Sequence, residues 1–71
     1  MRYYYDSPIG TMYIYPHNGK YNLEIQGDVC GTYDSAVAAA DDVFCHATGC
    51  YDWDKLQVND TPTDIHEWKR D

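Results

Sequence analysis

The chain has 71 residues, 44% of them apolar, and its 12 acidic and 5 basic side chains give a net charge of −7. This length allows one small domain with a thin core, and the apolar content excludes a disordered chain. The negative charge argues against nucleic acid and anionic membranes as partners, because both attract basic patches. It favours solubility, and it is read first as a solvated acidic surface, with a basic protein partner as the alternative.

Alternating apolar and polar residues in the first half predict antiparallel strands joined by tight turns. Asn18-Gly19, the strongest short hairpin signal, and Gly27-Asp28 mark two of these turns. The expected elements, in chain order, are an arm or edge strand at residues 1–9 and clear strands at residues 11–15, 21–26 and 29–33.

The register of these hairpins decides which side chains share a face of the sheet. Two-residue turns place Ile14 opposite Leu23 and Ile25 opposite Cys30. One face then collects five apolar side chains, which are Met12, Ile14, Leu23, Ile25 and Cys30. The other face collects tyrosines and polar residues, which are Tyr13, Tyr15, Asn22, Glu24, Gln26 and Tyr33.

Residues 36–48 contain no Gly or Pro and predict the only long helix. Asp34 and Ser35 are good N-cap residues, and Gly49 can end the helix in the left-handed conformation. At 100° per residue its apolar face contains Ala36, Ala39, Ala40, Val43, Phe44 and Ala47. Packed on the apolar sheet face, this helix completes an α+β fold, a three-stranded antiparallel β-meander with one α-helix on one face.

The chain is expected to form a single domain, residues 1–71, and the residues after the helix are predicted to be loop and tail. Trp53 and Leu56 are expected to close one end of the core. Thr61 starts a short helical turn within the tail at residues 57–71. That turn docks Ile65 and Trp68 on the body, and the last three residues form a frayed end.

Cysteine, histidine and acidic residues could hold a metal. The candidate zinc ligands are Cys45, His46 and Cys50, but the C-x4-C spacing lacks the second ligand pair of structural zinc sites. Surface or boundary thiols are the alternative reading. Asp52, Asp54 and Asp60 could bind calcium, yet the stretch lacks the glycine and glutamate of an EF-hand loop. We favour no metal, and keep the cysteine and histidine set as an alternative.

A catalytic reading pairs Cys45 or Cys50 with His46 or His66. Side chains at adjacent helical positions point about 100° apart, so Cys45 and His46 cannot hydrogen-bond to each other. No nucleophile triad order, phosphate-binding glycine loop or dinucleotide fingerprint is present. We therefore expect a protein that is not an enzyme and uses no cofactor.

Exposed tyrosines on a sheet suggest a binding surface, since tyrosine is a frequent interface anchor. The candidate partner-binding residues are Tyr13, Tyr15, Glu24 and Tyr33. Base stacking by such a sheet would need basic residues beside the rings, and the acidic chain favours protein instead. The alternative is that the N-terminal tyrosines, Tyr51 and Trp68 cover this face.

Two segments resemble known families. The run at residues 21–40, a strand, a glycine-containing hairpin and then G-x-Y-x-S-A-x-x-A-A, resembles the small bacterial YegP-like domains of unknown function. That resemblance implies short strands followed by one helix, and no activity. YYYDSPIGTMYI is similar to the opening hairpin of alkylguanine-DNA alkyltransferases. The Pro-Cys-His-Arg run of that family is absent, because Phe44 precedes Cys45-His46 and Ala47 follows, so its activity is not carried over.

The functional hypothesis is a small accessory module that binds another protein through its tyrosine-rich sheet face or through the acidic edge of its helix. The alternatives are a zinc-responsive protein and an acidic mimic of nucleic acid with carboxylates in a regular stripe. No apolar signal core follows Met1, no segment reaches transmembrane length, and three cysteines do not suit a secreted disulfide scaffold. We expect a cytoplasmic protein with reduced thiols, either a monomer or a weak homodimer paired through an exposed sheet edge.

Overall fold

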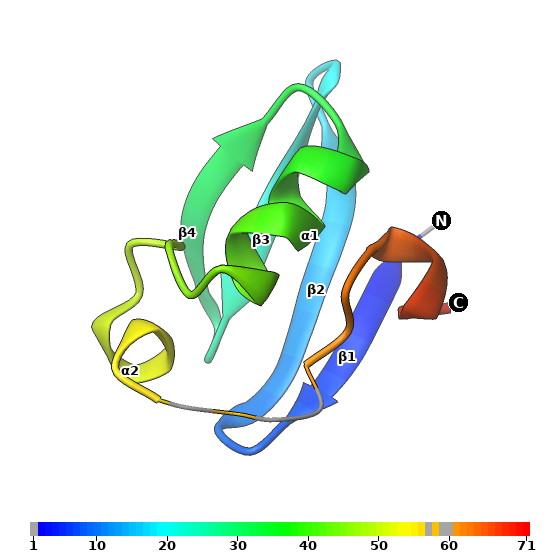
Figure 1. Cartoon of the computed structure of the whole chain (residues 1–71). Helices are drawn as coiled ribbons and strands as arrows, with labels where there is room; N and C mark the ends of the chain where they lie inside the picture. Colours follow the sequence, from blue (N-terminus) through cyan, green and yellow to red (C-terminus); the bar gives the residue numbers. More distant parts are fainter. Residues whose placement is uncertain (1, 57, 59–60) are drawn as a thin grey trace.

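The computed structural model describes residues 2–56, 58 and 61–71, and it places helical segments on one face of an antiparallel sheet (Figure 1). The elements in chain order are β1 (Tyr3–Ser7), β2 (Gly10–His17), β3 (Lys20–Ile25), β4 (Asp28–Tyr33), α1 (Ala36–Phe44), α2 (Tyr51–Asp54), the 3₁₀ helix η1 (Ile65–Glu67) and β5 (Lys69–Arg70). The predicted α+β class and antiparallel sheet are confirmed. The described sheet has five strands in the order β4-β3-β2-β1-β5 rather than three, because β1 and β5 extend the meander beyond β2.

The hairpin between β2 and β3 forms as its sequence predicts. Asn18 and Gly19 have φ angles of 53° and 79°, the left-handed pair that matches the twist of two strands. Ile14 pairs with Leu23 and Met12 pairs with Ile25. Their side chains are at most 1% exposed, which confirms the predicted apolar face of the sheet.

The hairpin between β3 and β4 differs from the prediction by one residue. Its turn is Gln26-Gly27, with φ angles of 56° and 82°, instead of Gly27-Asp28. The pairing then shifts at a bulge, with Glu24 opposite Val29 but Leu23 opposite Gly31. Cys30 is the extra residue of this bulge, and it still packs against the core. The misplaced turn alone would keep the predicted alternation of β4, whereas the inserted residue reverses the faces of the residues that follow it, so Tyr33 takes the side of Leu23 and Thr32 the opposite side.

Helix α1 begins where the sequence predicts and ends earlier. The Ser35 hydroxyl caps it by accepting a hydrogen bond from the Ala38 N–H at 3.1 Å. The helix ends at Phe44, since His46 turns into the left-handed region with φ 55°. Its buried residues are Ala36, Ala39, Ala40 and Val43. Two assignments to the buried face were wrong: Phe44 lies at the edge of the stripe and is 45% exposed, and Ala47 lies beyond the last turn and is exposed.

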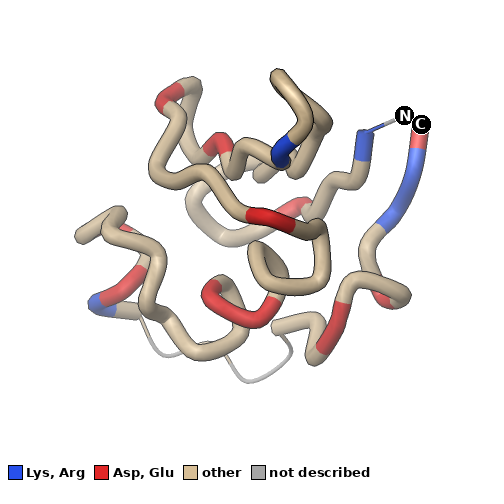
Figure 2. Tube along the Cα trace, turned by 90° about the horizontal axis from the view of Figure 1, so that it is seen from above, with Lys and Arg blue, Asp and Glu red and all other residues tan. Residues whose placement is uncertain are grey.

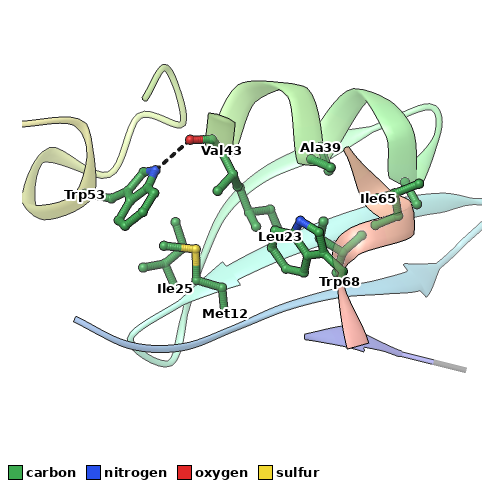
Figure 3. Packing of buried hydrophobic residues seen from close by; sticks show 11 residues of the cluster. Met12, Leu23, Ile25, Ala39, Val43, Trp53, Ile65 and Trp68 are labelled. Atoms are coloured by element: carbon green, nitrogen blue, oxygen red, sulfur yellow. Dashed lines mark hydrogen bonds between the residues drawn. The ribbon is translucent and has the colours of Figure 1, made fainter. Parts of the chain in front are cut away.

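Two tryptophans fill the space beside the alanine face of α1 (Figure 3). Trp53 is fully buried, and Trp68 is 5% exposed. Both rings contact Tyr5 of β1, with ring centroids 6.1 Å and 5.6 Å from the tyrosine ring. Small alanines let the helix approach the sheet, so the large indoles at its flanks supply much of the buried apolar area. The predicted closure of the core by Trp53 is therefore confirmed.

The loop between α1 and α2 is held by one carboxylate. Asp54 Oδ1 accepts hydrogen bonds from the Thr48 N–H at 2.9 Å and the Thr48 hydroxyl at 2.8 Å. Its Oδ2 accepts from the Gly49 N–H at 2.9 Å. The carboxylate thus satisfies the loop's backbone donors and fixes the segment that carries Trp53.

The C-terminal residues join the sheet instead of fraying. The expected helical turn forms as η1 and buries Ile65, but it starts after Asp64, its N-cap, and not at Thr61. After η1, β5 pairs with β1. The Arg2 N–H donates to the Asp71 carbonyl at 3.3 Å, and the Asp71 N–H donates back to the Arg2 carbonyl at 3.0 Å. The predicted frayed end was wrong, because β1 offers an unpaired edge that the last residues complete. Gln57 and Asn59, part of the predicted tail, lie outside the described residues.

All of the described helical segments cover the side of the sheet that carries the core. The opposite side, formed mainly by β1, β2 and β3, has no described element over it. None of the helices in the described ranges combines the length and the apolar character that crossing a membrane requires. The uncovered side therefore leaves a sheet surface on which a partner could bind.

Candidate functional site

The uncovered side of the sheet gathers three tyrosines from two neighbouring strands. Tyr13 and Tyr15 alternate with the buried residues of β2, so they point away from the core. Tyr13 pairs with Tyr4 of β1 and with Glu24 of β3, which places these three side chains in one row across the strands. We call this surface the tyrosine face, and its residues are Arg2, Tyr4, Tyr13, Tyr15, Asn22, Glu24 and Lys69.

Cations lie against the rings of the tyrosine face. The Tyr4 and Tyr13 rings are 6.4 Å apart and tilted by 44°. The Arg2 guanidinium carbon lies 4.7 Å from the centre of the Tyr13 ring, and the Lys69 ammonium lies 5.9 Å from the centre of the Tyr4 ring. These cation–π contacts favour the observed ring positions only weakly, as at other exposed sites.

Each cation on this face also has an acidic neighbour. Arg2 Nη2 lies 2.7 Å from Asp71 Oδ2, and Lys69 Nζ lies 3.6 Å from Asp6 Oδ2. The contact with Arg2, chiefly its hydrogen bond, lowers the pKa of Asp71. Exposed pairs of this kind add little stability, but they neutralise the charge of both cations. Figure 2 shows the two chain ends meeting at this place.

Glu24 is different, because it forms no ion pair with any described residue. It is half-buried in the centre of the sheet, beside Tyr13. Next to it, Asn22 is only 7% exposed and accepts a hydrogen bond from the Thr32 hydroxyl at 2.9 Å. The tyrosine face therefore combines aromatic surface with one carboxylate that forms no direct ion pair in the described part of the chain, although the charges of Glu24 and Arg2 attract each other at longer range.

Of the four predicted binding residues, Tyr13, Tyr15 and Glu24 lie together and Tyr33 does not. The bulge in β4 pairs Tyr33 with Tyr21 on the core side. Burial there raises the pKa of Tyr33 to about 12, and a hydrogen bond to Asp42 of α1 adds to the rise. The placement of Tyr33 on the tyrosine face was wrong, because the bulge reverses the alternation that the hairpin alone implies.

The candidate zinc ligands Cys45, His46 and Cys50 have separate surroundings. The His46 ring stacks on Trp53 with centroids 4.4 Å apart, and its Nδ1 lies 2.9 Å from the Trp53 carbonyl oxygen. Cys45 is exposed, whereas Cys50 is partly buried. Within residues 2–56, 58 and 61–71, no three His, Cys, Asp or Glu side chains lie where they could jointly hold a metal ion.

The calcium and catalytic candidates have other roles or lie apart. Asp54 is engaged by Thr48 and Gly49, Asp52 is within 3.9 Å of Lys55, and Asp60 lies outside the described residues. A shallow pocket of about 200 Å³ lies on the other side of the molecule, lined by Tyr3, Ile65, His66, Trp68 and Arg70. It is smaller than most small-molecule sites, which begin near 300 Å³.

Three residues of the tyrosine face were not predicted from the sequence, namely Arg2, Tyr4 and Lys69. The tyrosine run at residues 3–5 could have identified Tyr4, because the middle one of three consecutive strand residues faces the opposite side of the sheet from its two neighbours. Arg2 and Lys69 reach the face only through the pairing of β1 with β5.

Comparison with protein-family models, with curated proteins and with solved structures finds no match to this chain.

Proposed function

We propose that this protein is a non-enzymatic accessory module that binds another protein through the tyrosine face. The observation that carries the proposal is the arrangement of the layers. The helical segments lie on one side of the sheet, and Tyr4, Tyr13 and Tyr15 line the other with no described element over them. Tyrosine and arginine supply a large share of the binding energy in protein interfaces, and both are present on this face.

The charges of the face favour a partner with a basic side chain beside an apolar one. Arg2 and Lys69 are already neutralised by Asp71 and Asp6, so they attract anions weakly. Glu24 has no such partner among the described residues, and the net charge of −7 adds a negative field around it. A lysine or arginine that contacts Glu24 while an apolar group covers Tyr15 would satisfy both groups.

Amide-shift titration of isotope-labelled protein tests this proposal. The probe is the set of proteins from a cell lysate that a cation-exchange resin retains, compared with those that an anion-exchange resin retains. We expect the basic fraction to shift the amides of β1, β2 and β3. Tyr15→Ala should weaken the response at least tenfold, which is the size of an interface anchor, and Glu24→Gln should weaken it several-fold and reduce its salt dependence.

Val37→Ser is the matched control, because Val37 is 49% exposed on α1, on the far side of the sheet. It should leave the titration unchanged. Shifts confined to α1, or a response that Tyr15→Ala and Glu24→Gln do not alter, would refute binding through the tyrosine face. The acidic-mimic alternative gains no support, since Figure 2 shows acidic positions spread over separate segments rather than in one row.

A further inference from the structure

Two of the three cysteines share one corner of the molecule. Cys30 is the extra residue of the β4 bulge, and Cys50 is the N-cap residue of α2. Both are partly buried and pack against the hydrophobic core, whereas Cys45 is exposed. The chain therefore contains a candidate thiol pair and a third cysteine that serves as an internal comparison.

The backbone brings the pair together. A Cβ atom built on Gly49, the residue before Cys50, would lie 3.8 Å from the carbonyl oxygen of Cys30. Gly49 has φ 85°, and the Asp54 carboxylate holds its N–H, so the approach of this loop to β4 is fixed. Burial raises the pKa of Cys30 to about 11, and the adjacent Cys50 thiol adds to the rise by charge and by a hydrogen bond. The Cys30 thiol donates to the Asp28 carbonyl at 3.6 Å, and the Cys50 thiol lies near enough to act on it.

We propose that Cys30 and Cys50 form a reversible intramolecular disulfide that ties the edge strand β4 to α2, with a small disulfide such as glutathione disulfide as the oxidant. The bond would close a ring over residues 31–49, which include all of α1. It would anchor the segment carrying Trp53 to the sheet by a covalent bond in addition to packing.

The exchange proceeds in two balanced steps. The Cys50 thiolate attacks one sulfur of glutathione disulfide, which forms a mixed disulfide and releases one glutathione thiolate. Cys30 then loses its proton and attacks the Cys50 sulfur, which releases the second glutathione thiolate. Two protein thiols are oxidised to one disulfide, glutathione disulfide is reduced to two glutathiones, and the two protons pass to them. Burial raises the pKa of Cys30, which disfavours its thiolate as the first attacker.

Oxidation of the Cys45→Ser variant by glutathione disulfide tests the proposal. Alkylation of the remaining thiols followed by peptide mass analysis should show Cys30 and Cys50 joined, with no alkylated cysteine left. The thermal midpoint of the oxidised protein should exceed that of the reduced protein by roughly 10 °C, because a ring of about twenty residues restricts the unfolded chain. Added dithiothreitol should reverse both changes.

Cys30→Ser and Cys50→Ser, made in the same Cys45→Ser background, are the matched variants. Cys30→Ser should stop at a glutathione adduct on Cys50, Cys50→Ser should react more slowly because burial disfavours the Cys30 thiolate, and neither should show a rise in the midpoint. The wild-type chain gives a reading that does not depend on how the variants fold. There the cross-link should join Cys30 and Cys50, with Cys45 outside it, either as a free thiol or as a glutathione adduct. A cross-link that includes Cys45, free Cys30 and Cys50 after oxidation, or a lower midpoint in the oxidised protein would overturn the proposal.

Discussion

Trp53 and Trp68 contact the same tyrosine of β1, yet their indole N–H groups differ in whether they have a hydrogen-bond acceptor. Trp53 Nε1 donates to the Val43 carbonyl at 2.9 Å (Figure 3). Trp68 Nε1 is buried and has no acceptor among the described residues. A buried donor without an acceptor costs about 1–3 kcal/mol, so two residues of the same type and similar burial differ in how much they stabilise the fold.

The difference follows from the segments that carry the two rings. The Trp53 segment is held by directed contacts, since His46 stacks on the indole and Asp54 organises the preceding loop. The Trp68 segment consists of a single 3₁₀ turn and a two-residue strand. Hydrophobic burial is non-directional, so it can bury an indole ring without supplying a hydrogen-bond acceptor for its N–H group. Trp53 is therefore fixed by directed contacts, whereas Trp68 is held by hydrophobic burial.

Replacing Trp53 by phenylalanine should have the largest effect on this comparison. The variant loses the hydrogen bond to Val43, the stacking with His46 and part of the indole volume in a fully buried site. We expect a loss of about 2–3 kcal/mol in the free energy of unfolding, from the cavity and hydrogen-bond contributions together. Urea unfolding followed by circular dichroism measures this loss. A cost below 1 kcal/mol would show that Trp53 is no better anchored than Trp68.

Asp54→Asn should have the next largest effect. The amide keeps one acceptor oxygen but turns an NH₂ group toward a backbone donor, so the contact with either Thr48 or Gly49 is lost. We expect a cost of about 1–2 kcal/mol, as for hydrogen bonds to a charged group. The emission of Trp53 should shift to longer wavelength as its segment loosens, read in a Trp68→Phe background.

Asp52→Asn is the control for that measurement. Asp52 is exposed, and its only described ion pair, with Lys55, spans 3.9 Å. Neutralising it should change neither the unfolding free energy nor the emission. If both aspartates behaved alike, charge reduction on the short helix would explain the effect, and the three hydrogen bonds of Asp54 would not.

The sequence predicted those parts of the fold that depend on neighbours in the chain. Asn18-Gly19 is a strong turn signal, and the alternation on either side allows only one register with the apolar residues inside. The turn at Gln26-Gly27 was missed because glutamine is uncommon in the left-handed region, and Gly27-Asp28 was predicted in its place. The strand at Lys69–Arg70 was missed because it has no apolar pattern and forms only against β1.

The same distinction applies to the candidate site. Tyr13, Tyr15 and Glu24 alternate with core residues within single strands, so their common face follows from local periodicity. Tyr33 could not be placed that way, because the bulge at Cys30 reverses the faces of the residues after it. Arg2 and Lys69 come from opposite ends of the chain, and no local signal brings them together.

Tyr33 offers a pH test of the flank on which α1 meets β4. Its pKa is raised from 10.0 to about 12 by burial and by Asp42, so the fold favours the neutral phenol. The stabilisation is fully present below pH 10 and is lost as the pH rises from 10 toward 12. After a discount for partial exposure we expect a loss of about 1 kcal/mol.

Carbon-13 NMR of labelled tyrosine rings should show one resonance that titrates near pH 12 and disappears in Tyr33→Phe. That variant should also lose less stability between pH 10 and 12 than the wild type. A Tyr33 resonance titrating at the ordinary value would mean that the ring faces solvent, as the sequence alone suggested.

Trp68→Phe should have the smallest effect, and it is the most direct test of the comparison. The substitution removes apolar area from a site that is 5% exposed, which costs stability, but it also removes the buried N–H that lacks an acceptor. These contributions oppose each other at about 1 kcal/mol each, so the unfolding free energy should change by no more than about 0.5 kcal/mol. Trp68→Leu, which also lacks the donor but loses the ring contact with Tyr5, should cost more. If Trp68→Phe proved as damaging as Trp53→Phe, then the Trp68 N–H must be satisfied in solution, and the contrast between directed anchoring and burial would no longer hold.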